Sequence, residues 1–221
     1  MKLFLSAIAK FAFGVVLVGA LLFLPAGSLA FLQGWMLMAV LFVPMFAAGM
    51  VMLFVKPDLL KRRLNAKEKR KTQDLVIKLS GLMFIAGFVL SGLNFRFGWY
   101  TLPMGVSIIG VVLFLTAYAL YAEVLRENTY LSRTIEVSEG QKVVDTGLYG
   151  IVRHPMYAVM LLLFLSMPLI LGSIYALPIF LFYPFIIAKR IKDEEQLLEE
   201  ELEGYVEYKQ KVKYRLIPFI W

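Results

Sequence analysis

Long apolar runs separated by charged stretches constrain the fold of this chain more than any other feature. The runs cover residues 3–24, 31–55, 75–95, 102–122, 156–171 and 174–188. The first four each reach or exceed about 20 residues, the length that crosses a ~30 Å hydrocarbon core as a helix. We therefore predict an all-α, polytopic integral membrane protein with about six apolar helical segments, the last two forming a short hairpin.

The amino-acid composition agrees with a membrane protein and excludes several kinds of site. Sixty per cent of the residues are apolar and 18% are charged, whereas soluble domains carry about 25% charged residues. The chain has no cysteine and one histidine, His154, which excludes disulfides, thiolate chemistry and a multi-histidine metal site. We therefore expect no bound metal. The net charge of +7 comes from basic residues that flank apolar runs, which indicates membrane topology and no nucleic-acid partner.

The last two apolar runs are shorter than the others. Residues 156–171 and 174–188 each reach roughly 22 Å as a helix, less than the ~30 Å core of a bilayer, and Gly172-Ser173 separates them. We predict a tight helical hairpin that need not span the membrane fully. The charged stretch 189–221 is predicted to be helical as far as Lys213 and to form a C-terminal cytoplasmic or interfacial helix.

Basic residues predict how the chain crosses the membrane. The stretch 56–74 is strongly basic, with Lys56, Lys61, Arg62, Arg63, Lys67, Lys69, Arg70 and Lys71. A cytoplasmic loop explains this charge by the positive-inside rule, although binding of nucleic acid or anionic lipid would also fit. The same rule then puts both termini and residues 123–155 in the cytoplasm, and puts 25–30, 96–101 and the Gly172 turn on the other side.

No internal repeat divides the chain, so we expect a single membrane domain over residues 1–221. Residues 1–142 would hold the N-terminal transmembrane helices and the basic loop, and residues 143–221 would hold the functional core. Within that core the polar residues fall in two stretches, 144–157 and 189–212. The predicted hairpin joins these stretches, so they must meet at the same face of the membrane.

The first polar stretch contains the tripeptide Arg153-His154-Pro155. Proline favours the first turn of a helix, which would put His154 near the N-cap beside free backbone N–H groups. A helix N-terminus and the guanidinium of Arg153 both favour a carboxylate or a phosphate. An anion-binding site is therefore one interpretation, and an interfacial flank that stops a helix at the headgroups is the other.

The second polar stretch predicts a helix with a carboxylate on its apolar face. That face carries Ile191, Leu198, Leu202 and Tyr205. On a helical wheel Glu195 falls within the same stripe, and a buried carboxylate is costly unless it is paired. Glu195 would therefore face a polar or cationic ligand, or else reach sideways to solvent. Glu194 lies at the edge of the stripe. The opposite, solvent-facing side carries Asp193, Gln196 and Glu200.

Several motifs of the C-terminal third occur together. They are Gly147-x-Tyr149-x-x-x-Arg153-His-Pro-x-Tyr157, Arg190-Ile-x-x-Glu194-Glu195-x-x-Leu198 and Gly204-Tyr-x-x-Tyr208. With the hairpin between them, they resemble the isoprenylcysteine carboxyl methyltransferase family, in the form of its bacterial-type members. The resemblance covers residues 143–221 and implies a methyltransferase core. It also implies that S-adenosylmethionine binds at the cytoplasmic face, while a hydrophobic or lipid-like substrate enters from the bilayer.

The resemblance implies roles for individual residues. Those expected to hold the cofactor are Gly147, Tyr149, His154, Pro155, Tyr157, Glu194 and Glu195. Those expected to act in catalysis are Arg153, Arg190 and Glu195. The two arginines would orient a carboxylate acceptor, which needs no base. An amine or thiol acceptor would need a proton removed, for which Glu194 or Glu195 could serve.

The sequence leaves two other functions open. One is a membrane reductase that uses NADPH, because sterol reductases share a similar C-terminal architecture, and the other is a non-catalytic membrane protein. The chain also departs from the family: it has fewer membrane segments than the animal enzymes, and Glu201-Leu-Glu-Gly204 stands where eukaryotic enzymes tend to have Phe-Gly-Glu-Glu. The methyl acceptor therefore stays open, and we expect a location in a prokaryotic inner or plasma membrane.

Overall fold

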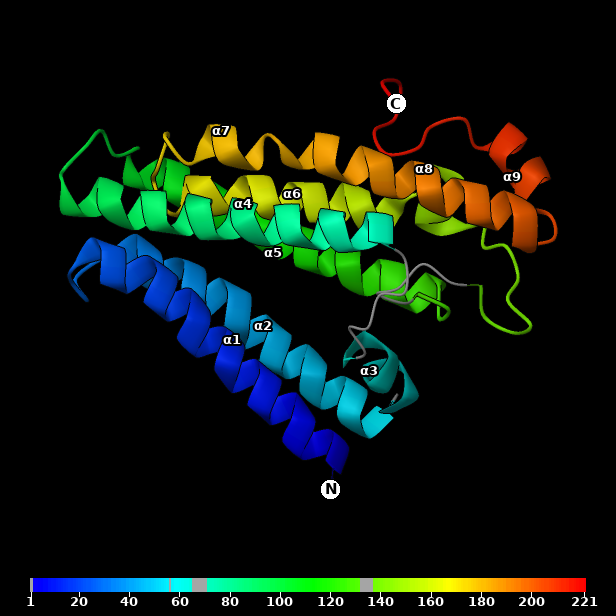
Figure 1. Cartoon of the computed structure of the whole chain (residues 1–221), viewed down its shortest axis with the longest axis horizontal. Coiled ribbons are helices and arrows are strands. Elements are labelled where there is room, and N and C mark those ends of the chain that lie inside the picture. Colours follow the sequence, from blue (N-terminus) through cyan, green and yellow to red (C-terminus); the bar gives the residue numbers. More distant parts are fainter. Residues whose placement is uncertain (1, 56, 65–70, 132–136) are drawn as a thin grey trace.

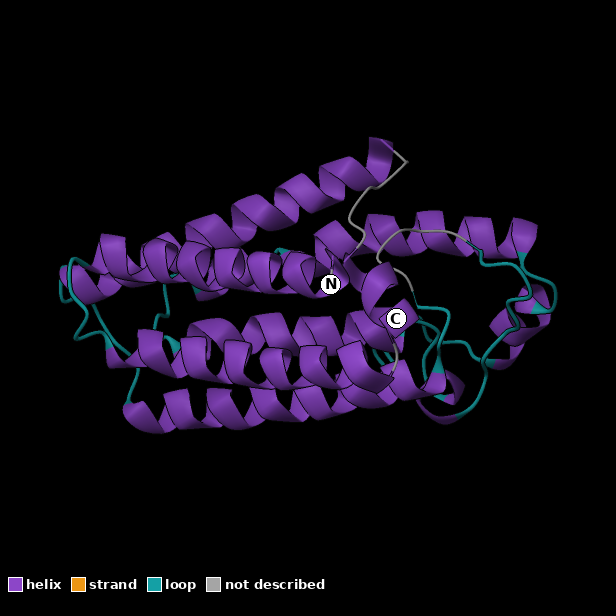
Figure 2. Cartoon of the chain, turned by 90° about the horizontal axis from the view of Figure 1, so that it is seen from below, coloured by secondary structure: helices purple, strands orange, loops and turns teal. Residues whose placement is uncertain are grey.

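The computed structural model describes residues 2–55, 57–64, 71–131 and 137–221. These residues form helices and loops without a strand, as the sequence predicts (Figure 2). In chain order the elements are α1 (Lys2–Ala26), α2 (Leu32–Val55), α3 (Pro57–Leu64), α4 (Lys71–Arg96), α5 (Met104–Glu127), the 3₁₀ helix η1 (Gly147–Gly150), α6 (Pro155–Ile170), α7 (Leu177–Phe180), α8 (Tyr183–Glu201) and α9 (Tyr205–Lys211).

The longest helices have the length and composition of membrane spans. The helices α1, α2, α4 and α5 are apolar over 23 or 24 residues, enough to cross a bilayer. Helix α6 is apolar but has only 16 residues, which agrees with the prediction of a shorter first arm in the hairpin. The described part of the chain is therefore that of a polytopic membrane protein.

The connections between helices lie at two ends of the molecule (Figure 1). The α1–α2, α4–α5 and α6–α7 connections lie at one end, and α3, α9 and the start of α1 lie toward the other. Within the basic stretch, α3 is a helix that the charge pattern alone does not predict. Lys56, Lys67, Lys69 and Arg70 lie outside the described residues, as do the side chains of Arg62, Arg63 and Lys71.

Glycines let the helices approach closely. Helices α4, α5, α6 and α8 form a bundle, and α1 and α2 lie together and slope away from it (Figure 1 and Figure 2). A Cβ at Gly110 of α5 would lie 2.8 Å from the Ile170 backbone nitrogen of α6, and one at Gly92 of α4 would lie 2.6 Å from the Leu22 carbonyl oxygen of α1. A larger residue at either position would push the two backbones apart.

The second arm of the predicted hairpin differs from the prediction. The chain forms the short α7 and then α8, which continues from Tyr183 to Glu201 through the charged residues. Pro184 explains the interruption before α8, because proline has no N–H to donate to the carbonyl of Phe180. No proline or glycine follows until Gly204, so nothing ends the helix at the boundary between apolar and charged residues.

The C-terminal helix is also not continuous as far as Lys213. Helix α8 ends at Glu201, and Gly204 adopts a left-handed conformation with φ of 84°. Because glycine has no Cβ, it takes this conformation without the penalty that other residues incur. Helix α9 then begins at Tyr205, which is buried together with Tyr208. The predicted interfacial helix is therefore two helices separated by a tight turn.

Candidate functional site

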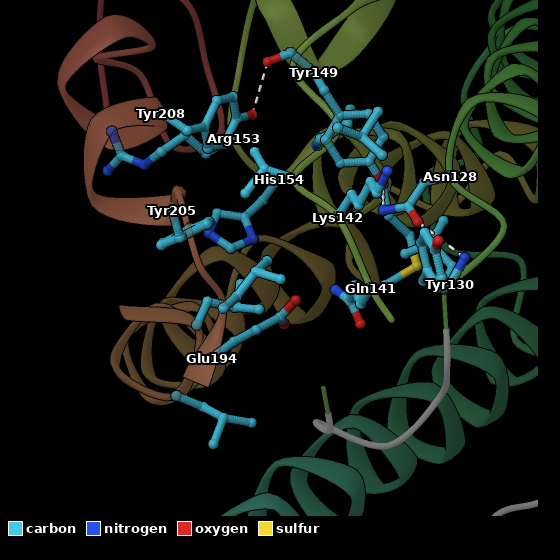
Figure 3. A pocket seen from close by; sticks show the side chains of 18 of the residues that line it. Asn128, Tyr130, Gln141, Lys142, Tyr149, Arg153, His154, Glu194, Tyr205 and Tyr208 are labelled. Atoms are coloured by element: carbon cyan, nitrogen blue, oxygen red, sulfur yellow. Dashed lines mark hydrogen bonds between the residues drawn. The ribbon is translucent and has the colours of Figure 1, made fainter. Parts of the chain in front are cut away.

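A pocket lies where α6 begins, beside the charged half of α8, α9 and residues 128–131 and 141–144 (Figure 3). One side carries His154, Glu194, Tyr205 and Tyr208. The opposite side carries Asn128, Tyr130, Gln141 and Lys142. The two polar stretches therefore meet, as the hairpin connection predicts.

Glu195 does not line this pocket and is surrounded by three basic side chains. Its Oε1 accepts a hydrogen bond from Arg153 Nε at 2.7 Å and lies 3.3 Å from His154 Nε2, and its Oε2 accepts one from Arg215 Nε at 2.8 Å. Burial by itself raises the pKa of Glu195, but the hydrogen bonds from His154, Arg153 and Arg215 outweigh it and lower the pKa to about 2. The carboxylate is therefore ionised and paired at both oxygens.

Arg153 also holds the C-terminal tail. Its Nη1 donates to the Val212 carbonyl at 2.7 Å, and its backbone N–H donates to the Tyr214 carbonyl at 2.9 Å. The backbone N–H of His154 donates to the Arg215 carbonyl at 2.9 Å. His154 is the N-cap of α6, as predicted. Its backbone N–H, however, is already bonded to the tail instead of being free for an anion.

Glu194 belongs to a different network, on the pocket wall. The Tyr157 hydroxyl donates a hydrogen bond to Glu194 Oε2 and accepts one from Arg190 Nε at 2.9 Å. The guanidinium of Arg190 also lies 5.9 Å from the centroid of the Tyr157 ring. Tyr157 and Arg190 are buried, whereas Glu194 is half-buried. Two buried neighbours therefore orient a carboxylate that a ligand can reach.

Gly147 and Tyr149 hold the turn that leads into α6. Gly147 has φ of 52°, and a Cβ there would lie 1.4 Å from Glu127 Oε1, so the turn requires glycine. The Tyr149 hydroxyl accepts a hydrogen bond from Asn128 at 3.1 Å, and its carbonyl accepts one from the Tyr208 hydroxyl at 2.7 Å. These bonds tie the end of α5, η1 and α9 together at the pocket, which Asn128, Tyr149 and Tyr208 all line.

The structure brings most of the predicted site residues to one pocket. Those that line it are Tyr149, Arg153, His154, Pro155, Tyr157, Arg190 and Glu194. Gly147 and Glu195 do not line it. The alternative that Glu195 reaches sideways to solvent is wrong, because Glu195 is buried, and the groups that contact its carboxylate are basic side chains of the protein itself. Its place is that of a positioning residue, which fixes Arg153 and His154.

Tyr205 and Tyr208 line the pocket but were not among the predicted site residues. The motif Gly204-Tyr-x-x-Tyr208 was the signal that could have found them. Tyr205 is only 4% exposed, and its hydroxyl has no hydrogen-bond partner among the described residues. Lys142 and Asn128 also line the pocket, and they come from a loop in which no motif marks them.

Known proteins resemble the segment that builds this pocket. Residues 108–200 match the sequence model of the Isoprenylcysteine carboxyl methyltransferase (ICMT) family. The match covers less than half of the chain, and it includes most of the residues that line the pocket. The ICMT match includes the Arg153-His154-Pro155 tripeptide and Glu194, whereas α9 with Tyr205 lies beyond it.

A solved structure shares the fold of this chain. It is the eukaryotic intramembrane Ras methyltransferase ICMT, with a TM-score of 0.60 and 21% identity over 97% of this chain and 77% of that chain. Among curated proteins, the Delta(14)-sterol reductase of Mus musculus is 32% identical over 40% of this chain and 22% of its own length. The Delta(14)-sterol reductase of Arabidopsis thaliana is 26% identical over 68% and 46%. The chain thus spans less than half of either reductase.

Proposed function

We propose that this chain is an integral membrane methyltransferase that binds S-adenosylmethionine in the pocket and methylates a hydrophobic or lipid-soluble acceptor. The observation that carries the proposal is a tyrosine-rich pocket with the carboxylate of Glu194 on its wall, built mostly by the segment that matches the ICMT family. The tyrosines that line it are Tyr130, Tyr149, Tyr157, Tyr205 and Tyr208.

The pocket residues fit the chemical groups of S-adenosylmethionine. Glu194 would bind the ammonium group or the ribose hydroxyls, since a half-buried carboxylate accepts strong hydrogen bonds. The Tyr205 hydroxyl is buried without a partner among the described residues, and a ligand would supply one. Lys142 is exposed at the opposite wall, where it would pair with the ligand carboxylate. The tyrosine rings would pack against the adenosine.

The residues of the chain would mainly position the reactants. When bound, S-adenosylmethionine supplies an electrophilic methyl group on a sulfonium. Methyl transfer needs an in-line approach of the acceptor, which is largely a matter of orientation. Arg190, fixed by Tyr157, would orient an anionic acceptor such as a carboxylate. An acceptor that must lose a proton would give it to Glu194, while Arg153 and Glu195 would hold the wall in place.

A membrane NADPH-dependent reductase is a second candidate, which the similarity to the two sterol reductases favours. NADPH carries several phosphate charges, and its binding would need cations free to pair with them. Arg153 is paired with Glu195, and Arg190 donates to Tyr157, so of the lysines and arginines that line the pocket only Lys142 would be left to pair with the phosphates. We therefore rank the methyltransferase first.

A binding experiment separates the two candidates. The purified protein is titrated with S-adenosylhomocysteine and, separately, with NADPH, and the melting temperature is followed. A methyltransferase should be stabilised by S-adenosylhomocysteine in a concentration-dependent way, and not by NADPH. Stabilisation by NADPH alone would support the reductase. No shift with either ligand would contradict both and would favour the non-catalytic protein.

We also propose that both termini and the pocket face the cytoplasm, because basic residues concentrate in the segments expected on that side of the membrane. This chain has no cysteine, so single introduced cysteines can report the topology. Gly98→Cys should react with an impermeant thiol reagent in intact cells, whereas Lys67→Cys should react only after permeabilisation. The opposite labelling pattern would invert the topology.

A further inference from the structure

We infer that Tyr205 and Glu194 form a subsite for a positively charged onium group, so that the pocket favours the methyl donor, with its charged sulfur, over the neutral demethylated product. The inference rests on the proposed function and adds to it a residue that determines specificity. Tyr205 lies outside the segment that matches the ICMT family, so its role is read from the pocket itself.

The hydroxyl of Tyr205 is a buried polar group that the protein leaves unpaired. Tyr205 is 4% exposed, it lines the pocket, and its hydroxyl has no hydrogen-bond partner among the described residues. Tyr208, three residues later on α9, instead donates to the Tyr149 carbonyl at 2.7 Å. Because an unpaired buried hydroxyl is costly, the contrast between the two tyrosines indicates that a ligand completes the surroundings of Tyr205.

The electrostatic surroundings of Tyr205 favour positive charge. Burial raises the pKa of Tyr205, and the carboxylates of Glu195 and Glu194 raise it further, while Arg153 acts in the opposite direction. The carboxylates disfavour a phenolate, so the hydroxyl stays protonated. The same negative potential would stabilise a cation placed against this side chain.

Aromatic rings add an attraction that is specific for cations. The rings of Tyr205 and Tyr208 lie 5.7 Å apart, as do those of His154 and Tyr157. Figure 3 shows Tyr205 beside His154, with Glu194 on the same side of the pocket. The face of a tyrosine ring attracts a cation within about 6 Å of its centroid. A sulfonium has no N–H to donate, but its polarised C–H groups can approach the Tyr205 oxygen, and its charge is attracted to the ring.

The methyl donor and its product make the inference measurable. S-adenosylmethionine and S-adenosylhomocysteine share the adenosine, the ammonium and the carboxylate, and they differ at sulfur by one methyl group and one charge. Contacts elsewhere in the pocket therefore change both affinities alike, whereas contacts at the sulfur change their ratio. A subsite that attracts the charged sulfur would also weaken the hold on the product once the methyl group has left.

The test measures the dissociation constants of both ligands by calorimetry on the purified full-length protein, without an acceptor. Wild type should bind S-adenosylmethionine more tightly than S-adenosylhomocysteine. Tyr205→Leu removes both ring and hydroxyl and should lower this preference roughly tenfold. Tyr205→Phe keeps the ring and should lower it about threefold. Glu194→Gln should weaken both ligands, because both carry the ammonium and ribose groups, and should weaken S-adenosylmethionine more, because it also removes a negative charge from the subsite.

Tyr208→Phe is the matched control, because it removes a hydroxyl that is already bonded to the protein. It should change both affinities by the same factor. If the ratio stays at the wild-type value in Tyr205→Leu and Tyr205→Phe while both variants bind S-adenosylhomocysteine, the inference is wrong and the proposed function stands. If Tyr205→Leu does not fold, Tyr205→Phe decides alone. If wild type binds neither ligand, the proposed function itself fails, and the inference with it.

Discussion

Glu194 and Glu195 are neighbours in the sequence, yet they belong to two regions of the molecule that work differently. Glu195 lies in a basic cluster with Arg153, His154 and Arg215, where both of its oxygens are paired. Glu194 lies on the pocket wall with Tyr157. Successive residues of a helix point about 100° apart, so one turn of α8 serves both regions.

In the basic cluster the polar groups are paired within the protein, whereas the pocket wall presents polar groups that a ligand can bind. In the basic cluster, Glu195 and Arg153 satisfy each other and clamp the C-terminal tail. On the pocket wall, Glu194 is half-buried, and the Tyr205 hydroxyl has no hydrogen-bond partner among the described residues. Mutations in the cluster should therefore act mainly on stability, and mutations on the wall mainly on ligand binding.

Glu195→Gln should have the largest effect on stability. It would leave Arg153, which is 6% exposed, without its charged partner, and breaking a buried pair in this way costs about 3–5 kcal/mol. The midpoint of thermal unfolding in detergent measures the loss. Glu200→Gln is the control, because Glu200 is exposed and accepts a hydrogen bond from Gln196 in the same helix. Equal melting temperatures for the two variants would show that the cluster does not stabilise the fold.

Glu194→Gln should weaken ligand binding strongly and change stability little, which is the reverse of Glu195→Gln. Affinity for S-adenosylhomocysteine should fall by about tenfold or more, which corresponds to the ~1.5–3 kcal/mol of a hydrogen bond to a charged group. The free energy of unfolding should change by less than about 0.5 kcal/mol, since the glutamine can still accept the Tyr157 hydroxyl. Calorimetric titration and thermal unfolding on the same preparation test both halves. A stability loss as large as that of Glu195→Gln would remove the distinction between the regions.

Low pH should remove the stability that the basic cluster around Glu195 contributes. The pKa of Glu195 is about 2 in the folded protein and 4.5 for an ordinary glutamate. Its carboxylate therefore stabilises the fold above pH 4.5, and this contribution is lost as the pH falls toward 2. The stability difference between wild type and Glu195→Gln should shrink over that range. A difference that stays constant from pH 6 to pH 3 would mean that Glu195 is not the titrating group.

Among the variants of the pocket wall, Arg190→Gln should change cofactor affinity the least. Turnover should fall or the acceptor's KM should rise severalfold, while S-adenosylhomocysteine binding stays nearly intact, because Arg190 would orient the acceptor. Lys192→Gln is the control, since Lys192 is exposed on the same helix. Full activity of Arg190→Gln towards an identified acceptor would make Arg190 a headgroup anchor only.

Much of the fold follows from the sequence because lipid imposes simple rules. Apolar length predicted α1, α2, α4 and α5, and Pro155 predicted the start of α6. The break before α8 and the turn before α9 were missed. Pro184 can begin a helix or interrupt one, and Gly204 can sit within a helix or end it. The outcome in each case depends on packing, which a single sequence does not reveal.

The sequence predicted which residues form the site better than it predicted which residues they bond to. The motifs selected Tyr157, Arg190 and Glu194, which lie together on the pocket wall. The wheel correctly put Glu195 on the buried face. Its partner Arg215 could not be foreseen, because the tail returns to α6 through backbone hydrogen bonds that carry no sequence periodicity.

The most direct test of the account is an experimental structure with S-adenosylhomocysteine bound. We predict density in the pocket between residues 147–157 and 190–208, in contact with Glu194 and Tyr205. The hydrogen bonds from Arg153 and Arg215 to Glu195 should be unchanged. Ligand density bonded to Glu195 in place of these arginines, or located outside the pocket, would contradict the division of α8 into a structural face and a binding face.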